Sequence, residues 1–153
     1  MHPSLGTASP TQRFLFLQGV CSPFFPRLAD ALRELGHGVR KVNFTVGDRV
    51  YWGRGEATAY RGPMERLPEF YAKQFRSHGT TDVVLFGDCR PVHRPAIELA
   101  KAHNIRVHVF EEGYFRPFWV TLEQGGVNGH SVFPRDPDSV SYTHLTLPTT
   151  PYV

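Results

Sequence analysis

Short apolar runs that alternate with helical segments constrain the fold of this chain most. The runs Arg13–Gly19, Asp82–Gly87 and Ile105–Phe110 consist mainly of Leu, Val and Phe, which is typical of strands buried in a parallel sheet. A fourth run, Gly38–Phe44, alternates apolar and polar residues and predicts a half-exposed strand. Because these strands are separated by helical patterns, the sequence predicts an α/β fold with a Rossmann-like, mainly parallel sheet.

Three helices are predicted between the strands. Arg27–Leu35 places leucines and alanine at helical spacing, with a proline before it and a glycine after it, as expected at helix ends. A second helix is predicted from Pro63 to His78, and Pro68 inside it can kink it. A third runs over Pro95–His103. The stretch that follows Phe44 is polar and glycine-rich through Gly62.

One domain is expected from 153 residues. Residues 1–12 are small and polar and are expected to form a disordered leader, and residues 13–138 form the Rossmann-like domain. Near its end, Gly125-Gly126 predicts a hairpin turn after a strand at Trp119–Glu123. Residues 139–153 are rich in Thr, Pro and Ser. We interpret them as non-native sequence, with a natural disordered tail as the alternative.

Composition restricts the class of partner. Hydrophobic residues make up 41% and charged residues 20% of the chain, which excludes a wholly disordered protein. The net charge is +3 and the basic residues are scattered, which argues against nucleic acid as a partner. A small positive excess suits anionic small molecules or an anionic membrane, although a slightly basic surface explains it equally well.

Compartment and metal binding follow from other sequence features. No apolar stretch is long enough for a transmembrane helix, and the first residues lack the apolar core of a signal peptide. Cys21 and Cys89 have no CxxC or Cys/His spacing, so we expect free thiols in the cytoplasm and no metal site.

Ligands bind beyond the carboxyl ends of the strands in sheets of this kind, so three loops are candidates. The first loop, residues 18–25, contains one glycine, Gly19, where a dinucleotide fingerprint needs three, and no P-loop sequence occurs. Dehydrogenase and NTPase functions are therefore unsupported. An ordinary turn with Phe24 and Phe25 packed on the core is an equally good interpretation of this loop.

The second loop, residues 87–94, gathers charged side chains before a predicted helix. Arg90 and Arg94 can hold a phosphate or carboxylate, and Asp88 or His93 can act as acid or base. For His93 alone, a structural role at the helix start is slightly favoured.

The third loop, residues 111–117, begins with two adjacent carboxylates, Glu111 and Glu112, which leave a buried strand. Removing two carboxylates from water costs free energy unless a cation neutralises them or they have a role in the function. A Glu112–Arg116 ion pair that fixes the loop is the structural alternative. We favour a functional role, because the aromatic residues that follow can line a sugar or lipid site.

These loops resemble a known family. The segments LQGVCSPFF, FGDCRPVHR and FEEGYFRPFWVTLEQGGVNGHS closely resemble the first domain of bacterial capsule polysaccharide proteins of the KpsS type, over about Arg13–Ser131. The resemblance implies a retaining β-Kdo glycosyltransferase with two Rossmann-like domains of the GT-B kind. Such an enzyme uses CMP-Kdo as donor substrate, needs no cofactor, and builds a Kdo linker on a phosphatidylglycerol-type lipid.

The resemblance also implies partners and residue roles. The chain would be the acceptor-side half of an enzyme at the inner membrane, near capsule assembly and export proteins, and inactive without its nucleotide-binding half. The alternatives are a non-catalytic component of a capsule export complex and a generic anion-binding module. The residues implied as catalytic are Glu111, Glu112, Asp88 and His93; those implied in substrate binding are Gly19, Arg90, Arg94, Gly113, Tyr114, Arg116 and Asn128.

Overall fold

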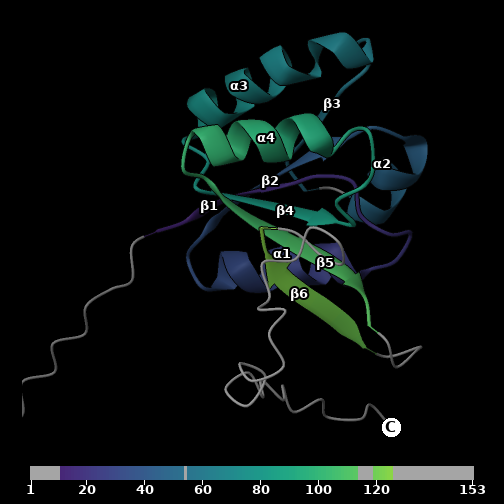
Figure 1. The fold of residues 1–153 in the computed structure, drawn as a ribbon. Helices are drawn as coiled ribbons and strands as arrows, with labels where there is room; N and C mark the ends of the chain where they lie inside the picture. Colours follow the sequence, from purple (N-terminus) through teal and green to yellow (C-terminus); the bar gives the residue numbers. More distant parts are fainter. Residues whose placement is uncertain (1–10, 54, 114–118, 126–153) are drawn as a thin grey trace, which may run out of the picture.

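The structure is a computed structural model that describes residues 11–53, 55–113 and 119–125 (Figure 1). Nearly all of the expected leader, the whole segment 139–153, and the turn residue Gly126 lie outside the described residues. The same holds for three predicted site residues, Tyr114, Arg116 and Asn128.

A six-stranded sheet forms the centre of the domain, with strand order β3-β2-β1-β4-β5-β6. Neighbouring strands pair in parallel except at β5 and β6, which are antiparallel. The predicted mainly parallel α/β fold is therefore confirmed. The strands are β1 (Arg13–Phe16), β2 (Gly38–Asn43), β3 (Ala57–Ala59), β4 (Asp82–Phe86), β5 (Arg106–Glu112) and β6 (Val120–Gln124).

Helices cover both faces of this sheet (Figure 1). α3 and α4 lie on one face and α1 lies on the other, while α2 follows the carboxyl end of β2. The chain builds outward from β1 in one direction and from β4 in the other, so the order reverses between these two strands. The helices are α1 (Phe24–Glu34), α2 (Val46–Trp52), the short 3-10 helix η1 (Met64–Arg66), α3 (Leu67–His78) and α4 (Arg94–Ala102).

Two prolines mark helix starts differently from the prediction. α1 begins at Phe24, three residues before the predicted start, so Pro26 lies in its first turn. Pro68 is the second residue of α3 and therefore begins that helix instead of kinking it. Both positions are tolerated because the first N–H groups of a helix have no intrahelical acceptor, so a proline there loses no hydrogen bond.

The polar, glycine-rich stretch after Phe44, for which no helix or strand was predicted, contains α2. Its first turn is closed by a reciprocal capping box between Thr45 and Asp48. The Asp48 N–H donates to Thr45 Oγ1 at 3.1 Å, and Asp48 Oδ2 accepts from the Thr45 N–H at 3.1 Å. The sequence signal was the Thr-x-x-Asp spacing, which satisfies two otherwise unpaired N–H groups.

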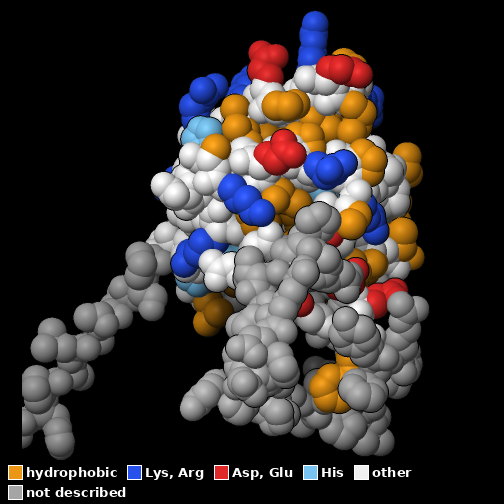
Figure 2. Space-filling model, viewed as in Figure 1, with side chains coloured by type: hydrophobic (Ala, Val, Ile, Leu, Met, Phe, Trp, Pro, Cys, Tyr) orange, Lys and Arg blue, Asp and Glu red, His pale blue; other side chains and the backbone are white. Residues whose placement is uncertain are grey.

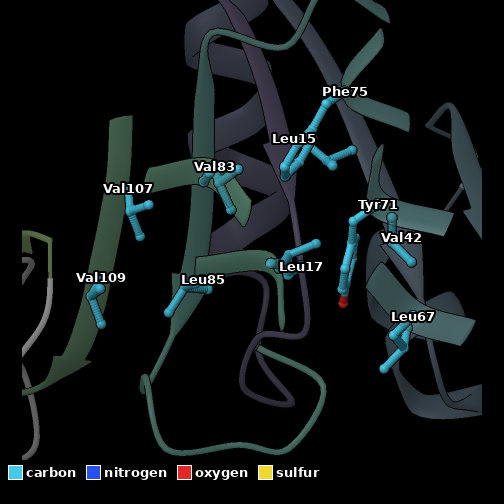
Figure 3. Packing of buried hydrophobic residues seen from close by; sticks show 12 residues of the cluster. Leu15, Leu17, Val42, Leu67, Tyr71, Phe75, Val83, Leu85, Val107 and Val109 are labelled. Atoms are coloured by element: carbon cyan, nitrogen blue, oxygen red, sulfur yellow. The ribbon is translucent and has the colours of Figure 1, made fainter. Parts of the chain in front are cut away.

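Alternate residues of the strands fill two cores, one on each face of the sheet. Leucines and valines of β1, β4 and β5 pack against Tyr71 and Phe75 of α3 (Figure 3). Phe16, Phe25 and Phe110 pack on the α1 face, where the Phe16 and Phe25 ring centroids are 5.2 Å apart. The expected packing of Phe25 on the core is confirmed, and the two-residue period of the strands separates the two cores.

A buried carboxylate joins β4 to β5 at their amino-terminal ends. Asp82 is 1% exposed and pairs across the strands with Arg106. Arg106 Nε and Nη2 each donate to it at 2.8 Å, and His108 Nε2 lies 2.7 Å from its Oδ1. Burial alone would raise the pKa of Asp82, but these hydrogen bonds and the one from Thr81 lower it below its ordinary value. Asp82 is therefore a charged anchor of the sheet.

We expect Asp82→Asn to lower the free energy of unfolding at pH 7 by about 2 kcal/mol, because it breaks a buried ion pair whose partner Arg106 can still reach solvent. Urea unfolding measures the change. The matched control is Asp30→Asn, which breaks an ion pair with Arg33 whose carboxylate is 70% exposed and should change stability by less than about 0.5 kcal/mol. Equal effects of the two substitutions would contradict the anchoring role.

Candidate functional site

The carboxyl ends of β1, β4 and β5 lie next to one another, so the three candidate loops follow adjacent strands. Arg90 of the second loop reaches across the strand-order reversal, where its Nη1 donates to the Gly19 carbonyl oxygen of the first loop at 3.3 Å. The structure thus brings together two residues that the sequence predicted as substrate-binding. Gly19 also has a packing role, because a Cβ atom there would lie 2.6 Å from the Phe25 ring.

His93 holds the second loop in place. Its side chain is fully buried, and its Nδ1 lies 2.6 Å from the Gly87 carbonyl oxygen, to which it donates. Burial, with smaller contributions from the nearby Arg90 and Lys41 charges, lowers the pKa of His93 to about 4. The imidazole is therefore neutral at pH 7. Its Nε2 is buried with no hydrogen-bond partner among the described residues. These contacts favour the structural interpretation of His93.

The loop is also held from the α3 side. The Tyr71 hydroxyl donates to the Val92 carbonyl oxygen at 2.6 Å, and the surrounding core raises the pKa of that hydroxyl. A buried histidine and a buried tyrosine therefore position the backbone on which Arg90 and Asp88 stand.

Sequence analysis missed the buried Lys41, which lies on β2 in a strand predicted to be half-exposed. Lys41 is 3% exposed, and its Nζ donates to the Leu17 carbonyl oxygen at 2.8 Å and to that of Val42 at 3.2 Å. Asp48 Oδ1 lies 3.7 Å from Nζ. Burial lowers the pKa of Lys41 to about 8, against the opposing effect of Asp48. The alternating pattern did not single out this position, and in the structure Asp48 and Trp52 of α2 lie beside the Lys41 ammonium group.

Acidic residues gather on the other side of the second loop. The Cys89 thiol donates to Asp88 Oδ1 at 3.2 Å, which raises the pKa of the thiol, and the nearby Glu111 charge raises it further. Arg94 acts in the opposite direction. Asp88, Glu111 and Arg94, all predicted site residues, are thus within electrostatic range of one thiol. Asp88 is 8% exposed, so its carboxylate is largely shielded from water.

The sequence had placed Glu111 and Glu112 in the loop that follows β5. In the structure both residues belong to β5 itself. Neighbouring residues of a strand point to opposite faces. Phe110 packs on the α1 face, so Glu112 faces that side and Glu111 faces the side of α4. Glu111 is half-buried and Glu112 is exposed. The desolvation argument therefore applies to Glu111 only, and the predicted Glu112–Arg116 pair lies outside the described residues.

Gly113, predicted to bind substrate, is required by the local packing. Its N–H donates to the Trp119 carbonyl oxygen at 2.8 Å, and a Cβ atom would lie 2.7 Å from the Trp119 Cβ. A glycine therefore allows the chain to approach closely where β5 ends and β6 begins.

Two pockets adjoin these residues. The first, which we call the switch-point pocket, has a volume of about 210 Å³ and is lined by Gln18, Gly19, Val20, Cys21, Thr45, Gly47, Asp48 and Arg90. The second, about 380 Å³, lies along α4 and is lined by Asp88, Cys89, Arg94, Ile97, Glu98, Lys101 and Gly125. Arg90 thus lines the first pocket, whereas Asp88, Cys89 and Arg94 line the second.

Other features limit what the described residues can do. Within residues 11–53, 55–113 and 119–125, no group of three or more His, Cys, Asp or Glu is placed to hold a metal ion. Nor does any helix in that part of the chain have the length and apolarity to cross a membrane. On the face shown in Figure 2, Lys and Arg side chains are interspersed with Asp and Glu. Both cysteines are free and exposed.

The strand order β3-β2-β1-β4-β5 and its reversal between β1 and β4 define a Rossmann-like α/β domain. In this class of domain, ligands bind at the carboxyl edge of the sheet, where the polar loops lie. Comparison with known proteins gives the family. Residues 81–150 match the profile described as capsule polysaccharide biosynthesis protein. The match extends into the segment 139–153, whose origin stays a prediction.

Two kinds of relative support this family. The chain is 41% identical over 142 residues to the capsule polysaccharide export protein KpsS of Escherichia coli, which is 93% of this chain and 36% of that protein. It is 40% identical over 129 residues to the capsule polysaccharide modification protein LipB of Neisseria meningitidis serogroups A and B, 83% of this chain and 31% of theirs. No solved structure gives a significant match.

The profile match and the identity to KpsS over 93% of this chain together support a capsule polysaccharide protein of the KpsS type. The chain spans about a third of the length of these curated relatives. The resemblance seen in the motifs is thus supported by both comparisons.

We expect the stability of the domain to depend on the protonation of His93. Its pKa is about 4 in the folded protein and 6.5 in the unfolded chain, so the unfolded state binds more protons between these values. The contribution of the neutral His93 to the free energy of unfolding is therefore complete above pH 6.5. It decreases as the pH falls toward 4, by up to about 3 kcal/mol.

Urea unfolding at pH 7 and pH 4.5 tests this expectation with His93→Asn, whose amide can still donate to Gly87 but does not titrate. The variant should be less stable at pH 7 and should lose less stability on acidification. Asp82 titrates in both proteins, so only the difference between them counts. Identical pH dependence in both proteins would show that His93 is not buried in its neutral form.

Proposed function

We propose that the full-length protein transfers Kdo from CMP-Kdo to a phosphatidylglycerol-type lipid, building the linker of a capsular polysaccharide. In this proposal the present domain forms the acceptor-side wall of the active site. The observation that carries it is the meeting of the GDCRPVHR and EEG motifs at one edge of the sheet, where the charges of Asp88, Arg94 and Glu111 all act on the Cys89 thiol. The match to the capsule polysaccharide biosynthesis profile supports it.

The carboxylates would act on the acceptor. A general base removes the proton of the attacking hydroxyl as its oxygen bonds to the sugar. Glu111, Glu112 and Asp88 are the candidates, and Arg90 and Arg94 would bind the anionic groups of the substrates. His93, Gly19 and Gly113 would shape the site by the contacts described above. Tyr114, Arg116 and Asn128 stay predicted contributors.

A second Rossmann-like domain, in a GT-B-like arrangement, would supply the CMP-Kdo site. It would also supply the carboxylate that displaces CMP before the acceptor displaces that carboxylate, so that the configuration is retained. Exposed apolar side chains of α2 support a covering domain. Val46 is 79% exposed and Val50 is 69% exposed, on a helix at the carboxyl end of β2. Such a surface is typical of a face that another domain covers.

The proposed setting is the cytoplasmic face of the inner membrane. The acceptor is an anionic lipid, so the enzyme would work as a peripheral protein beside capsule assembly and export proteins. The small net positive charge of the chain suits such a surface.

A non-catalytic role in capsule export is the second candidate. The observation that favours it is the name of the E. coli relative, an export protein. In this case the same edge would bind a polysaccharide or a partner protein without turnover.

Release of CMP separates the two candidates. A full-length protein carrying this domain, given CMP-Kdo and phosphatidylglycerol, should release CMP. Glu111→Gln should lower that rate by about a hundredfold or more, because a general base contributes at least that much and Glu111 is the β5 carboxylate whose charge acts on Cys89 together with those of Asp88 and Arg94. Glu34→Gln is the control, since Glu34 is exposed at the last turn of α1, and it should leave the rate unchanged. Binding of the lipid or polysaccharide without CMP release by a folded protein would exclude transfer and favour the export role.

The proposed second domain can be tested at the source locus. Resequencing across the codons of residues 136–153 should show a reading frame that diverges from the present one near residue 139 and continues into another βαβ-rich domain. A natural stop codon after Val153 would contradict both the second domain and the non-native origin of the segment, and would favour a binding module.

A further inference from the structure

The switch-point pocket contains a cation, Arg90, that no described carboxylate neutralises. Arg90 lines the pocket, and the one hydrogen bond that its side chain makes within the described part of the chain goes to the neutral Gly19 carbonyl. None of the carboxylates described lies within ion-pair distance of Arg90. A guanidinium has five N–H donors in a planar fork, so most of its donors stay available to a ligand.

A second cation lies beneath the pocket. Lys41 is held by two carbonyl oxygens and lies 3.7 Å from the carboxylate of Asp48, whose other oxygen accepts hydrogen bonds from the Phe44 and Thr45 N–H groups. The Asp48 charge is therefore compensated by Lys41 and by backbone donors. With Arg90 and Lys41 positive, Asp48 negative and His93 neutral, the pocket keeps one net positive charge.

The charge of Arg90 also acts on the groups around it. The Arg90 charge lowers the pKa of both Lys41 and His93, as expected where positive potential accumulates. Arg94, four residues further on, lines the other pocket together with Asp88 and Glu98. Lys101 also lines that pocket, so its lining carries two acidic and two basic side chains, whereas Asp48, which is paired with Lys41, is the one described acid that lines the switch-point pocket.

We propose that the switch-point pocket is an oxyanion subsite that binds one phosphate or carboxylate group, with Arg90 contacting the anion and the buried Lys41–Asp48 pair as positioning residues. Its volume of about 210 Å³ suits a single anionic group and not a whole nucleotide sugar, since complete ligand sites occupy about 300–1,000 Å³. Thr45 and Gln18 line the same pocket and add polar side chains for neighbouring hydroxyls.

The identity of the bound anion rests on the proposed function, in which it is either the phosphate of the lipid acceptor or the carboxylate of the sugar. Binding itself needs no transfer. A pocket that binds the anion in a protein without transferase activity would support the subsite and refute the proposed function. Transferase activity in a protein whose pocket binds no anion would support the proposed function and refute the subsite.

The test is an NMR titration of the ¹⁵N-labelled 153-residue chain with inorganic phosphate, glycerol 3-phosphate and Kdo, at constant ionic strength. We expect the amide shifts to concentrate at Gly19–Cys21 and Gly47. Arg90→Gln should weaken binding by about tenfold, the amount expected from losing a charged hydrogen bond, and Arg90→Lys should weaken it less. Tighter binding of glycerol 3-phosphate than of Kdo would identify the phosphate as the source, and the reverse order would identify the carboxylate.

Arg49→Gln is the matched control, because it removes the same charge from the exposed side of α2 without lining the pocket. It should change the affinity by less than about twofold, since an exposed charge at a distance is screened. Equal weakening by Arg49→Gln and Arg90→Gln, shifts centred elsewhere, or no binding of any of the three anions would overturn the assignment.

The role of Lys41 has its own readout. Lys41→Met, provided that its spectrum shows a folded protein, should move the amide signals of the first loop in the absence of any anion and weaken binding. If it does not fold, Thr45→Val tests the same support, because it removes the hydroxyl of the capping box and leaves every charge in place. Unchanged anion affinity in a folded Lys41→Met protein would show that Lys41 has no positioning role.

Discussion

The parallel pairing of β1 with β4 is the constraint on which the arrangement of the site depends. These two strands are distant in the sequence but adjacent in the sheet, with Phe14 opposite Asp82. Their neighbours lie on opposite sides, so the loops that follow them meet at the point where the strand order reverses. The Arg90–Gly19 contact spans this point. The contact between the first and second loops follows from this adjacency.

Buried polar groups, and not apolar packing alone, fix the backbone at that edge. Lys41 ties β2 to the end of β1, His93 ties α4 to Gly87, and Tyr71 ties α3 to the second loop. Each of these side chains makes a hydrogen bond to a backbone carbonyl oxygen. A buried polar group that is satisfied in this way specifies one arrangement of its surroundings, because any other leaves it unpaired.

The edge is divided into a basic and an acidic half. Arg90 and Lys41 lie near the first loop, whereas Asp88 and Glu111 surround Cys89. The separation suits a reaction in which an anionic group is held on one side while a carboxylate acts on a hydroxyl on the other. Within a family of capsule polysaccharide proteins, substrates that carry both phosphate and sugar hydroxyls match such a site. The proposed transfer reaction uses both halves.

The sequence alone determined the α/β class, β1, β4, β5 and α4, because apolar runs and helical periodicity are local properties that tertiary packing reinforces. It also determined which loops carry the polar residues, and the motifs in them indicated the family. Only the tertiary structure decided that Lys41 is buried, since α2 covers it, and that Glu111 and Glu112 face opposite sides, since β5 extends through them. Burial and strand extension depend on residues distant in the sequence, and periodicity cannot report those contacts.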